Sequence, residues 1–343
     1  MKEGWGYKKL GEVATIINGK NQKAVEDESG IYPICGSGGT MGYANDFLCP
    51  EQTVIIGRKG NINRPIYMEQ KFWNVDTAFG IVANRTQLVP KYLYYFCIDF
   101  NFEKLNKAVT IPSLVKSDLL KIEMAVPPLS EQQHIVEELD LLSSIIEKKK
   151  VQLNELDNLA QSLFYEMFGD PITNDKGWEV RKLNDIYKLK SGDGLSAKNF
   201  VEGIYPVYGG NGISGYHNAY NMNGDFIIIG RVGAYCGNVR YVKGLFWLTD
   251  NAFQLFFDAN IQTPVFVLYL LTLLDLHRFA NEAAQPVISN KTLRDLDIII
   301  PTMEMQKLFA SKIETIEHQK ELIRKSIKEV ETLYNSRMDF WFN

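Results

Sequence analysis

Two loops rich in glycine and arginine hold the residues best suited to binding chemistry. Residues 57–64 read Gly-Arg-Lys-Gly-Asn-Ile-Asn-Arg, and residues 230–240 read Gly-Arg-Val-Gly-Ala-Tyr-Cys-Gly-Asn-Val-Arg. Arginine and lysine bind phosphates or guanine edges, asparagine reads adenine, and glycine lets a backbone approach a duplex closely. The loops therefore suit DNA contacts, and their candidate residues are Arg58, Lys59, Asn61, Asn63, Arg64, Arg231, Tyr235, Asn238 and Arg240.

Two polar, basic stretches form a second set of candidates. Residues 18–23 and 188–199 follow the first predicted strand of each half of the chain. Ordinary solvated loops have a similar composition, so that alternative stays open. The DNA-binding candidates in these stretches are Lys20, Asn21, Lys23, Lys190, Lys198 and Asn199.

No catalytic signature accompanies these loops. The chain lacks G-x-x-x-x-G-K-[ST], G-x-G-x-x-G before a helix, and the Asn-Pro-Pro-Tyr or Asp-Pro-Pro-Tyr run that an amino-methyltransferase needs. The glycine-rich runs at residues 36–39 and 209–212 are expected to form turns. The histidines are scattered, without metal-binding spacing. The sequence therefore predicts no catalytic residue, no metal site and no cofactor.

The composition is that of an ordinary globular protein with room for two domains. The 343 residues are 45% hydrophobic and 23% charged. The four cysteines form no C-x-x-C pair, and the N-terminus has no apolar signal segment. The most apolar windows, residues 253–257 and 265–274, are too short to span a bilayer. We therefore expect a cytoplasmic protein with no membrane contact.

The negative charge is concentrated in one segment. Residues 130–168 hold 3 Lys and Arg against 8 Asp and Glu, whereas residues 1–129 hold 15 against 13 and residues 171–303 hold 12 of each. The globular parts are therefore close to neutral, although the net charge is −4. DNA would be held weakly by this chain unless a partner supplied positive charge.

The chain is a tandem duplication, because many stretches return in the same order about 173 residues later. Gln132 also matches Gln306. The matching stretches are, in pairs, residues 5–13 and 178–186, 31–34 and 204–207, 54–58 and 227–231, 76–79 and 250–253, and 122–127 and 296–301.

The duplication separates two kinds of candidate. Arg58 and Arg231 are shared by both copies, so ion pairs with the aligned Asp76 and Asp250 are an equal alternative to DNA binding. Residues that differ between the copies suit base reading better, because two copies need not read the same bases.

Two long helices are predicted from heptad spacing, at residues 130–168 and 304–343. Ser130 is the expected N-cap of the first, with Gln133 completing a capping box, and Gly169 is the expected stop. Packing of each helix on a globular core is the alternative to a helix pair. The two seams are Ile135, Leu139, Leu142, Ile146, Lys149, Leu153, Leu156, Ala160, Leu163 and Met167, and Phe309, Ile313, Ile316, Lys320, Ile323, Ile327, Val330 and Tyr334.

The predicted fold class is α+β, with two tandem-duplicated mixed α/β globular domains joined by two long antiparallel coiled-coil helices. Antiparallel helices would relate the domains by a pseudo-two-fold, and a parallel pair would put both domains at one end. Within each copy, buried strands precede a helix (residues 90–100 or 263–277) and a final strand (122–126 or 296–300). The predicted segments are residues 1–129, 130–169, 170–303 and 304–343.

The chain resembles a specificity (S) subunit of a type I restriction-modification system. The matching features are Trp-x-x-x-x-Leu at the start of each copy, Pro-Pro-Leu-Ser-Glu-Gln-Gln at residues 127–133, and Phe-Tyr-Glu-Met-Phe-Gly-Asp-Pro at residues 164–171. The second copy departs from this pattern, because residues 301–306 keep only the proline and the glutamine. The resemblance covers essentially the whole chain.

The resemblance implies a non-enzymatic DNA reader. Each domain would be a target recognition domain that reads one half of a bipartite site in double-stranded DNA. The paired helices would set the spacer and bind methyltransferase (M) subunits, two of them by expectation, through which restriction (R) subunits would join. The first seam is roughly 48 Å long, so the half-site centres would lie at most about 14 base pairs apart.

Two other classes of protein remain as alternatives. A protein–protein scaffold with duplicated peptide-binding domains would need no DNA, and mass spectrometry with methyltransferase and DNA would distinguish it. A nuclease with an unfamiliar site would cleave plasmid when Mg²⁺ is added to the isolated chain.

Overall fold

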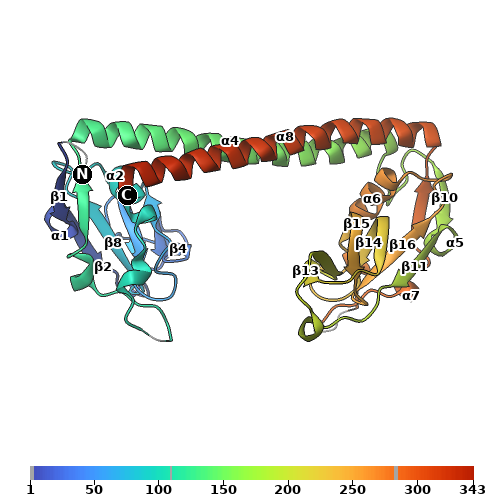
Figure 1. Cartoon of the computed structure of the whole chain (residues 1–343), viewed down its shortest axis with the longest axis horizontal. Helices are drawn as coiled ribbons and strands as arrows, with labels where there is room; N and C mark the ends of the chain where they lie inside the picture. Colours follow the sequence, from blue (N-terminus) through green and yellow to red (C-terminus); the bar gives the residue numbers. More distant parts are fainter. Residues whose placement is uncertain (1–3, 109, 282–284) are drawn as a thin grey trace. The chain divides into compact units, whose positions relative to one another are not determined.

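The structure, a computed structural model, describes residues 4–108, 110–281 and 285–343. The chain forms two compact units: unit 1 is Met1–Lys150 with Lys325–Asn343, and unit 2 is Val151–Arg324. Two long helices, α4 (Leu129–Phe168) and α8 (Met303–Phe342), each contribute one end to each unit (Figure 1). The fold class is therefore the predicted one, with two mixed α/β domains joined by two long helices.

Unit 1 is organised around a four-stranded antiparallel sheet in the order β2-β8-β5-β6. Its strand β5 is wholly buried and reads Thr-Val-Ile-Ile-Gly, as expected for β-branched residues in a sheet interior. A three-stranded sheet, β4-β3-β7, and the pair β1-β9 complete the unit. The strands are β1 (Gly6–Lys9), β2 (Ala14–Asn18), β3 (Tyr32–Gly36), β4 (Gly39–Ala44), β5 (Thr53–Gly57), β6 (Ile66–Met68), β7 (Trp73–Asn74), β8 (Ala78–Ala83) and β9 (Glu123–Val126).

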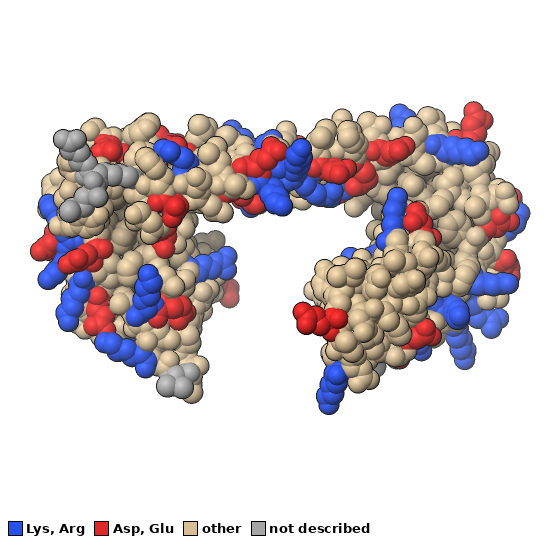
Figure 2. All heavy atoms as spheres, viewed as in Figure 1, with Lys and Arg blue, Asp and Glu red and all other residues tan. Residues whose placement is uncertain are grey.

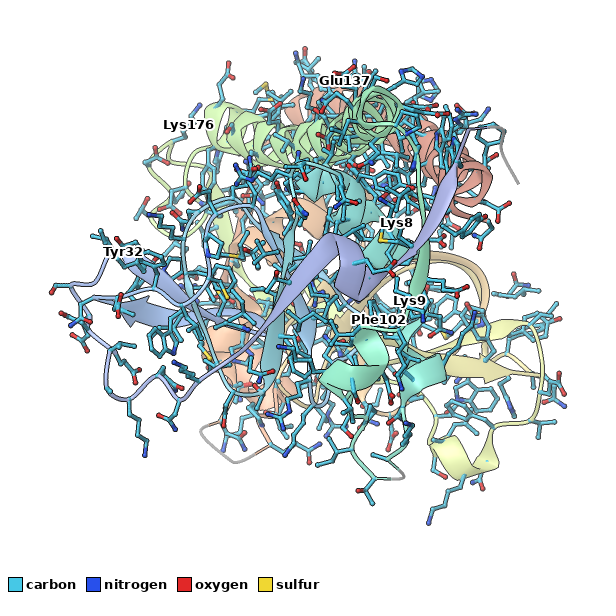
Figure 3. All side chains as sticks on the ribbon, turned by 90° about the vertical axis from the view of Figure 1, so that its left-hand side faces the viewer. Lys8, Lys9, Tyr32, Phe102, Glu137 and Lys176 are labelled. Carbon is cyan, nitrogen blue, oxygen red and sulfur yellow. The ribbon has the colours of Figure 1, made fainter. Side chains whose placement is uncertain are left out.

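One helix of ordinary length packs on this sheet. Pro90 begins α2 (Pro90–Asp99), where its missing N–H costs nothing, and Tyr92 and Leu93 are fully buried in the core. In Figure 3 the β3–β4 hairpin, marked by Tyr32, lies well away from α4, marked by Glu137. The remaining helical turns are α1 (Leu10–Val13), η1 (Phe102–Leu105) and α3 (Lys116–Leu119).

Unit 2 repeats this plan with one difference. In unit 1 the short strands β6 and β7 belong to separate sheets. In unit 2 a single ten-residue strand, β15, pairs antiparallel with β14 and parallel with β12, which joins the two sheets into one of six strands. The strands are β10 (Glu179–Lys182), β11 (Tyr187–Ser191), β12 (Tyr205–Gly209), β13 (Gly212–His217), β14 (Met222–Gly230), β15 (Val239–Leu248), β16 (Ala252–Phe257) and β17 (Asp297–Ile300).

An aromatic cluster anchors α4 and α8 to unit 2. Phe164 and Phe168 of α4 and Phe309 of α8 surround Phe266 of α6 (Pro264–Leu273), and all four side chains are fully buried. The ring centroids of Phe168 and Phe266 lie 4.9 Å apart in an edge-on arrangement. The remaining helical elements of the unit are α5 (Leu183–Ile186), η2 (Ala197–Asn199), η3 (Leu276–Phe279) and α7 (Asn290–Leu293).

The two long helices run antiparallel within each unit. In unit 2, Asp157 of α4 contacts Lys320 of α8, while Phe164, further along α4, contacts Phe309, further back along α8. In unit 1, Glu138 contacts Arg337. Every predicted seam position is buried or half-buried, and charged side chains of both signs follow the exposed faces of the helices (Figure 2). The predicted seam positions are therefore the buried stripe of each helix, including Lys320. Towards the helix ends the seam also packs on the domain cores, as Ile135 does in unit 1 and Phe309 in unit 2, so both predicted kinds of packing occur.

The predicted N-cap of α4 is wrong, whereas the predicted stop is confirmed. Leu129 and Ser130 already lie in the helix, and the Pro128 carbonyl accepts the first bonds, from the Glu131 and Gln132 N–H groups at 2.9 and 3.0 Å. The Gln133 side chain bonds Glu137 instead of forming a capping box. Proline at 127 and 128 therefore sets the start. Gly169 has φ +74°, the left-handed conformation that ends a helix.

A buried glutamine fixes each domain to the start of its long helix. Gln132 accepts a hydrogen bond from the Val89 N–H at 2.8 Å and donates to the carbonyls of Gln87 and Pro127 at 2.9 and 2.8 Å. In unit 2 the aligned residue makes the same three contacts. Gln306 accepts from the Thr263 N–H at 2.8 Å and donates to the carbonyls of Ile261 and Pro301 at 3.0 and 2.8 Å.

Candidate nucleic-acid interface

In unit 1 the two loops that carry most of the candidates meet at one turn. The Lys20 N–H donates to the Asn74 carbonyl at 2.9 Å, and the Arg58 N–H donates to the Thr77 carbonyl at 2.8 Å. The indole of Trp73 donates to the Lys20 carbonyl at 3.1 Å. The turn that leads from Asn74, at the end of β7, to Ala78, at the start of β8, therefore holds both loops.

Unit 2 builds the same junction from aligned residues. The Arg231 N–H donates to the Asn251 carbonyl at 2.8 Å, and the Asp193 N–H donates to the Leu248 carbonyl at 3.0 Å. Here the indole of Trp247 donates to the Asp193 carbonyl at 3.2 Å. The loops that carry the two candidate sets thus meet in one loop cluster in each domain, which the sequence did not predict. The prediction of a loop over residues 188–199 is wrong at its start, because Lys190 lies on strand β11.

A third segment, which sequence reasoning missed, supports each Gly/Arg loop. In unit 1 the Gly60 N–H donates to the Pro112 carbonyl, and the Leu114 N–H donates to the Arg58 carbonyl, both at 2.9 Å. In unit 2 the Gly233 N–H donates to Pro286, and the Ile288 N–H donates to Arg231, again at 2.9 Å. The sequence did contain a signal for this segment, because a proline recurs at the repeat spacing, at residues 112 and 286.

The shared arginines stack on matched aromatic rings. The Arg58 guanidinium lies 5.9 Å from the centroid of the Phe79 ring, and that of Arg231 lies 5.3 Å from the Phe253 ring. Within the described residues neither arginine forms an ion pair with the carboxylate of Asp76 or Asp250. The predicted ion pairs are therefore wrong, although Arg231 does contact Asp250 through the backbone carbonyl of that residue.

Arg231 is further tethered by two oxygen atoms. Its Nη1 donates to Ser191 Oγ at 3.2 Å and to the Asp250 backbone carbonyl at 3.4 Å. Its Nε is buried and has no partner in the described part of the chain. Arg58 is exposed, so the same stacked arginine is more open to solvent in unit 1 than in unit 2.

The other candidates are all exposed, but some also have structural contacts. Asn63 accepts a hydrogen bond from the Phe102 N–H at 2.8 Å, and Asn21 accepts one from the Lys23 N–H at 2.9 Å. Arg240 lies on β15, next to Gly212 of the β12–β13 turn. The remaining candidates, whose side chains form no hydrogen bond or ion pair with other described residues, are Lys20, Lys23, Lys59, Asn61, Arg64, Lys190, Lys198, Asn199, Tyr235 and Asn238.

The glycine-rich runs lie at these loop clusters and form the hairpin turns that the sequence predicts. Gly39 and Gly212 have φ values of +106° and +96°, which favour glycine. Gly210 also packs against the Arg231 loop, because a Cβ added there would lie 2.2 Å from the Val232 carbonyl oxygen. The β12–β13 hairpin is therefore held directly over that loop.

Burial keeps the four cysteines in the neutral thiol form. All four are buried and free, and burial raises the pKa of Cys49 to about 12. Burial likewise raises the pKa of the Cys236 thiol, next to the exposed Tyr235. Within the described residues, no group of three or more His, Cys, Asp or Glu side chains could hold a metal ion. No helix in the described part of the chain is long and apolar enough to cross a membrane.

The family model of the type I restriction modification DNA specificity domain matches this chain twice, at residues 2–158 and 175–332. The chain belongs to this family. Each match contains one globular domain with its loop cluster. The duplication predicted from internal repeats is therefore a duplication of the DNA specificity domain, and DNA recognition is the role that both domains share.

Relatives and solved structures agree with this assignment. The EcoprrI specificity subunit of Escherichia coli is 28% identical over 315 residues, covering 84% of this chain and 76% of that protein. The MjaVIII specificity subunit of Methanocaldococcus jannaschii is 22% identical, covering 96% and 90%. A type I S subunit structure from M. genitalium shares the fold, with a TM-score of 0.64 at 17% identity, covering 99% of this chain and 96% of that one.

Proposed function

We propose that this chain is the specificity subunit of a type I restriction-modification complex, and that each domain reads one half of a bipartite site in double-stranded DNA. The observation that carries this proposal is the double match to the DNA specificity domain, with one loop cluster in each matched region. A chain with two such domains needs two half-sites. Because the loop residues differ between the copies, the two half-sites differ in sequence.

The shared and the differing residues have separate tasks in this proposal. The shared arginines, Arg58 and Arg231, contact phosphates and set the register of each domain on the duplex. The residues that differ, such as Asn61 and Tyr235, contact base edges. Support comes from the common frame of the clusters, in which the backbone bonds are repeated while the exposed side chains change.

The long helices bind methyltransferase subunits, two in number, through which restriction subunits join the complex. Support comes from large apolar side chains on their exposed faces, which a single chain leaves in water. Leu141 and Leu333 are 62% and 49% exposed in unit 1, and Leu159 and Leu322 are 51% and 54% exposed in unit 2. Methyl transfer and cleavage belong to those partners, and the specificity chain contributes recognition only.

Methylation-sensitive sequencing of host DNA, with and without the gene for this chain, tests the proposal. We expect one bipartite motif to carry methylation when the chain is present and to lose it when the chain is absent, while other methylated motifs stay unchanged. Unchanged methylation at every motif would contradict the proposal. The isolated chain, incubated with plasmid and Mg²⁺, should leave the DNA uncut, and cleavage would show that the chain itself is a nuclease.

A further inference from the structure

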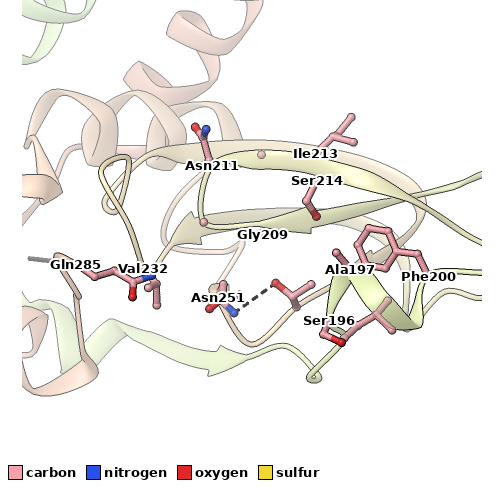
Figure 4. A pocket seen from close by; sticks show the side chains of 14 residues that line it. Ser196, Ala197, Phe200, Gly209, Asn211, Ile213, Ser214, Val232, Asn251 and Gln285 are labelled. Carbon is pink, nitrogen blue, oxygen red and sulfur yellow. Dashed lines mark hydrogen bonds between the residues drawn. The ribbon is translucent and has the colours of Figure 1, made fainter. Parts of the chain in front are cut away.

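A hollow of about 420 Å³ lies in unit 2 beneath the turn of the β12–β13 hairpin (Figure 4). The residues that line it are 195–197, Phe200, 209–214, Val232 of the Gly/Arg loop, Thr249, Asn251 and Gln285. The hollow therefore lies inside the loop cluster of this domain, beside the backbone of Arg231.

The lining of the hollow combines apolar side chains, such as Phe200 and Ile213, with polar side chains that carry no charge. Asn211, Asn251 and Gln285 contribute side-chain amides, and the hydroxyls come from Ser196, Ser214 and Thr249. Both charged and neutral side chains bind phosphates, but only contacts to base edges read sequence, and asparagine and glutamine amides match the donor and acceptor pattern of adenine. The hollow is thus suited to base edges, and the stacked Arg231 beside it supplies positive charge for the backbone.

The backbone of Asn251 is held in place, and all three side-chain amides remain available. The Asn251 N–H is bonded to Thr249 Oγ1 at 3.3 Å, and its carbonyl accepts from the Arg231 N–H at 2.8 Å. Its side-chain amide has no hydrogen-bond partner in the described residues, and the same holds for Asn211 and Gln285. In Figure 4 the Gln285 side chain extends toward Asn251 below the hairpin.

Comparison of the two domains shows that the amides are a special feature of unit 2. The hairpins pair identically, Gly209 with Gly212 and Gly36 with Gly39, which aligns Asn211 with Gly38. The backbone N–H of each shared arginine donates to Thr77 in unit 1 and to Asn251 in unit 2, so these two residues occupy the same position. In the same way, the Gly/Arg loops bond Pro112 and Pro286, so the preceding residues, Ile111 and Gln285, are aligned. The backbone contacts are therefore the same in both domains, while the three amides occur at these positions in unit 2 only.

We propose that Asn211, Asn251 and Gln285 are specificity-determining residues of the second domain, and that the hollow receives the edge of an A·T base pair. An asparagine or glutamine amide makes two hydrogen bonds to adenine, at N6 and N7. This inference rests on the proposed function and extends it, because it assigns three residues, none of them predicted from the sequence, to one of the two half-sites.

The test uses the full chain together with its methyltransferase subunit, expressed in a host whose DNA is then sequenced for methylation. The variants are Asn211→Ala, Asn251→Ala, Asn251→Asp and Gln285→Ala. Asn251→Asp keeps the shape of the side chain and removes the N–H donors. The matched control is Asn218→Ala, an exposed asparagine of the same domain outside the hollow. Thermal unfolding of each purified variant confirms that the chain is folded.

The expected result is that one A·T position in one half-site becomes degenerate, with discrimination falling about tenfold or more, while the other half-site is read as before. Asn218→Ala should retain the wild-type motif. Folded amide variants that keep the wild-type motif at every position, or a wild-type motif in which the affected half-site requires no A·T pair, would overturn the inference. A wild-type chain that directs no methylation would instead contradict the proposed function, so the two failures are distinguishable.

Discussion

At the scale of single residues, the structure explains why two glutamines recur 174 positions apart. Gln132 and Gln306 are fully buried, and each joins a loop of its domain to the proline that precedes a long helix. A buried amide that makes three bonds is costly to remove, because its partners lose their hydrogen bonds without gaining water.

Replacement of Gln132 by alanine should therefore destabilise unit 1. We expect the free energy of unfolding to fall by about 2 kcal/mol or more, because the Val89 N–H and two carbonyls lose their partner. Urea denaturation followed by circular dichroism measures the change. Gln133→Ala, at the exposed neighbouring position, should cost less than about 0.5 kcal/mol. Equal effects of the two variants would show that the buried bonds contribute little.

Arg58 belongs to the phosphate-binding residues in our account, and its removal should weaken DNA binding without changing the motif. In the complex with methyltransferase subunits, Arg58→Gln should reduce the slope of log K against log salt by about 0.9 for each lost phosphate contact. Arg85→Gln, an exposed arginine beside Glu51, is the control and should leave the slope unchanged. A changed recognition motif in Arg58→Gln would identify this residue as a base reader instead.

At the scale of elements, the sequence predicted the strands, the long helices and their seams, because periodic burial is a local signal. It did not predict contacts that depend on register or on distant loops. Lys320 was recognisable as a polar seam residue, but its partner Asp157, at 2.6 Å, is fixed only by the antiparallel register. Likewise the meeting of the candidate loops at residues 74–78 depends on Trp73 and on backbone bonds that no side-chain pattern encodes.

The pair formed by Glu138 and Arg337 fixes α8 on α4 in unit 1. Arg337 makes a bidentate contact with the Glu138 carboxylate, with Nη2 and Oε2 3.0 Å apart, and the Trp341 indole donates to the same carboxylate at 2.8 Å. The Arg337 hydrogen bond lowers the pKa of Glu138, partial burial opposes it, and the indole lowers it further.

This pKa predicts an acid-dependent loss of stability. A carboxyl whose pKa is lower in the folded state stabilises that state above its unfolded pKa, about 4.3, and the contribution is lost as the pH falls through the folded pKa. Glu138→Gln should cost about 1–2 kcal/mol at pH 7 and flatten the pH dependence below about pH 4. Denaturation curves from pH 7 to pH 3 measure this, with the exposed Glu137→Gln as control. An unchanged pH dependence in Glu138→Gln would contradict the assignment.

At the scale of the whole molecule, α4 and α8 each pass from one unit to the other without a break. A continuous helix transmits length directly, at 1.5 Å per residue. In our proposal these helices therefore act as the ruler that sets the spacer between the two half-sites.

Insertion of one heptad after Lys150 and one after Arg324 tests the ruler. The insertions keep both seams in phase and add about 10 Å of helix. The spacer of the methylated motif should then lengthen by roughly three base pairs. Sequencing of host DNA for methylation reads the spacer directly. A spacer of unchanged length in a chain that still directs methylation would reject the ruler.

The central claim is that the two domains read two half-sites independently. The most direct test replaces residues 1–129 with the corresponding domain of another specificity subunit. Methylation-sensitive sequencing compares the motif of the exchanged chain with that of the parent. Our account predicts that one half-site takes the donor's sequence while the other half-site and the spacer remain those of the parent. A motif in which both half-sites change, or in which neither changes, would contradict it.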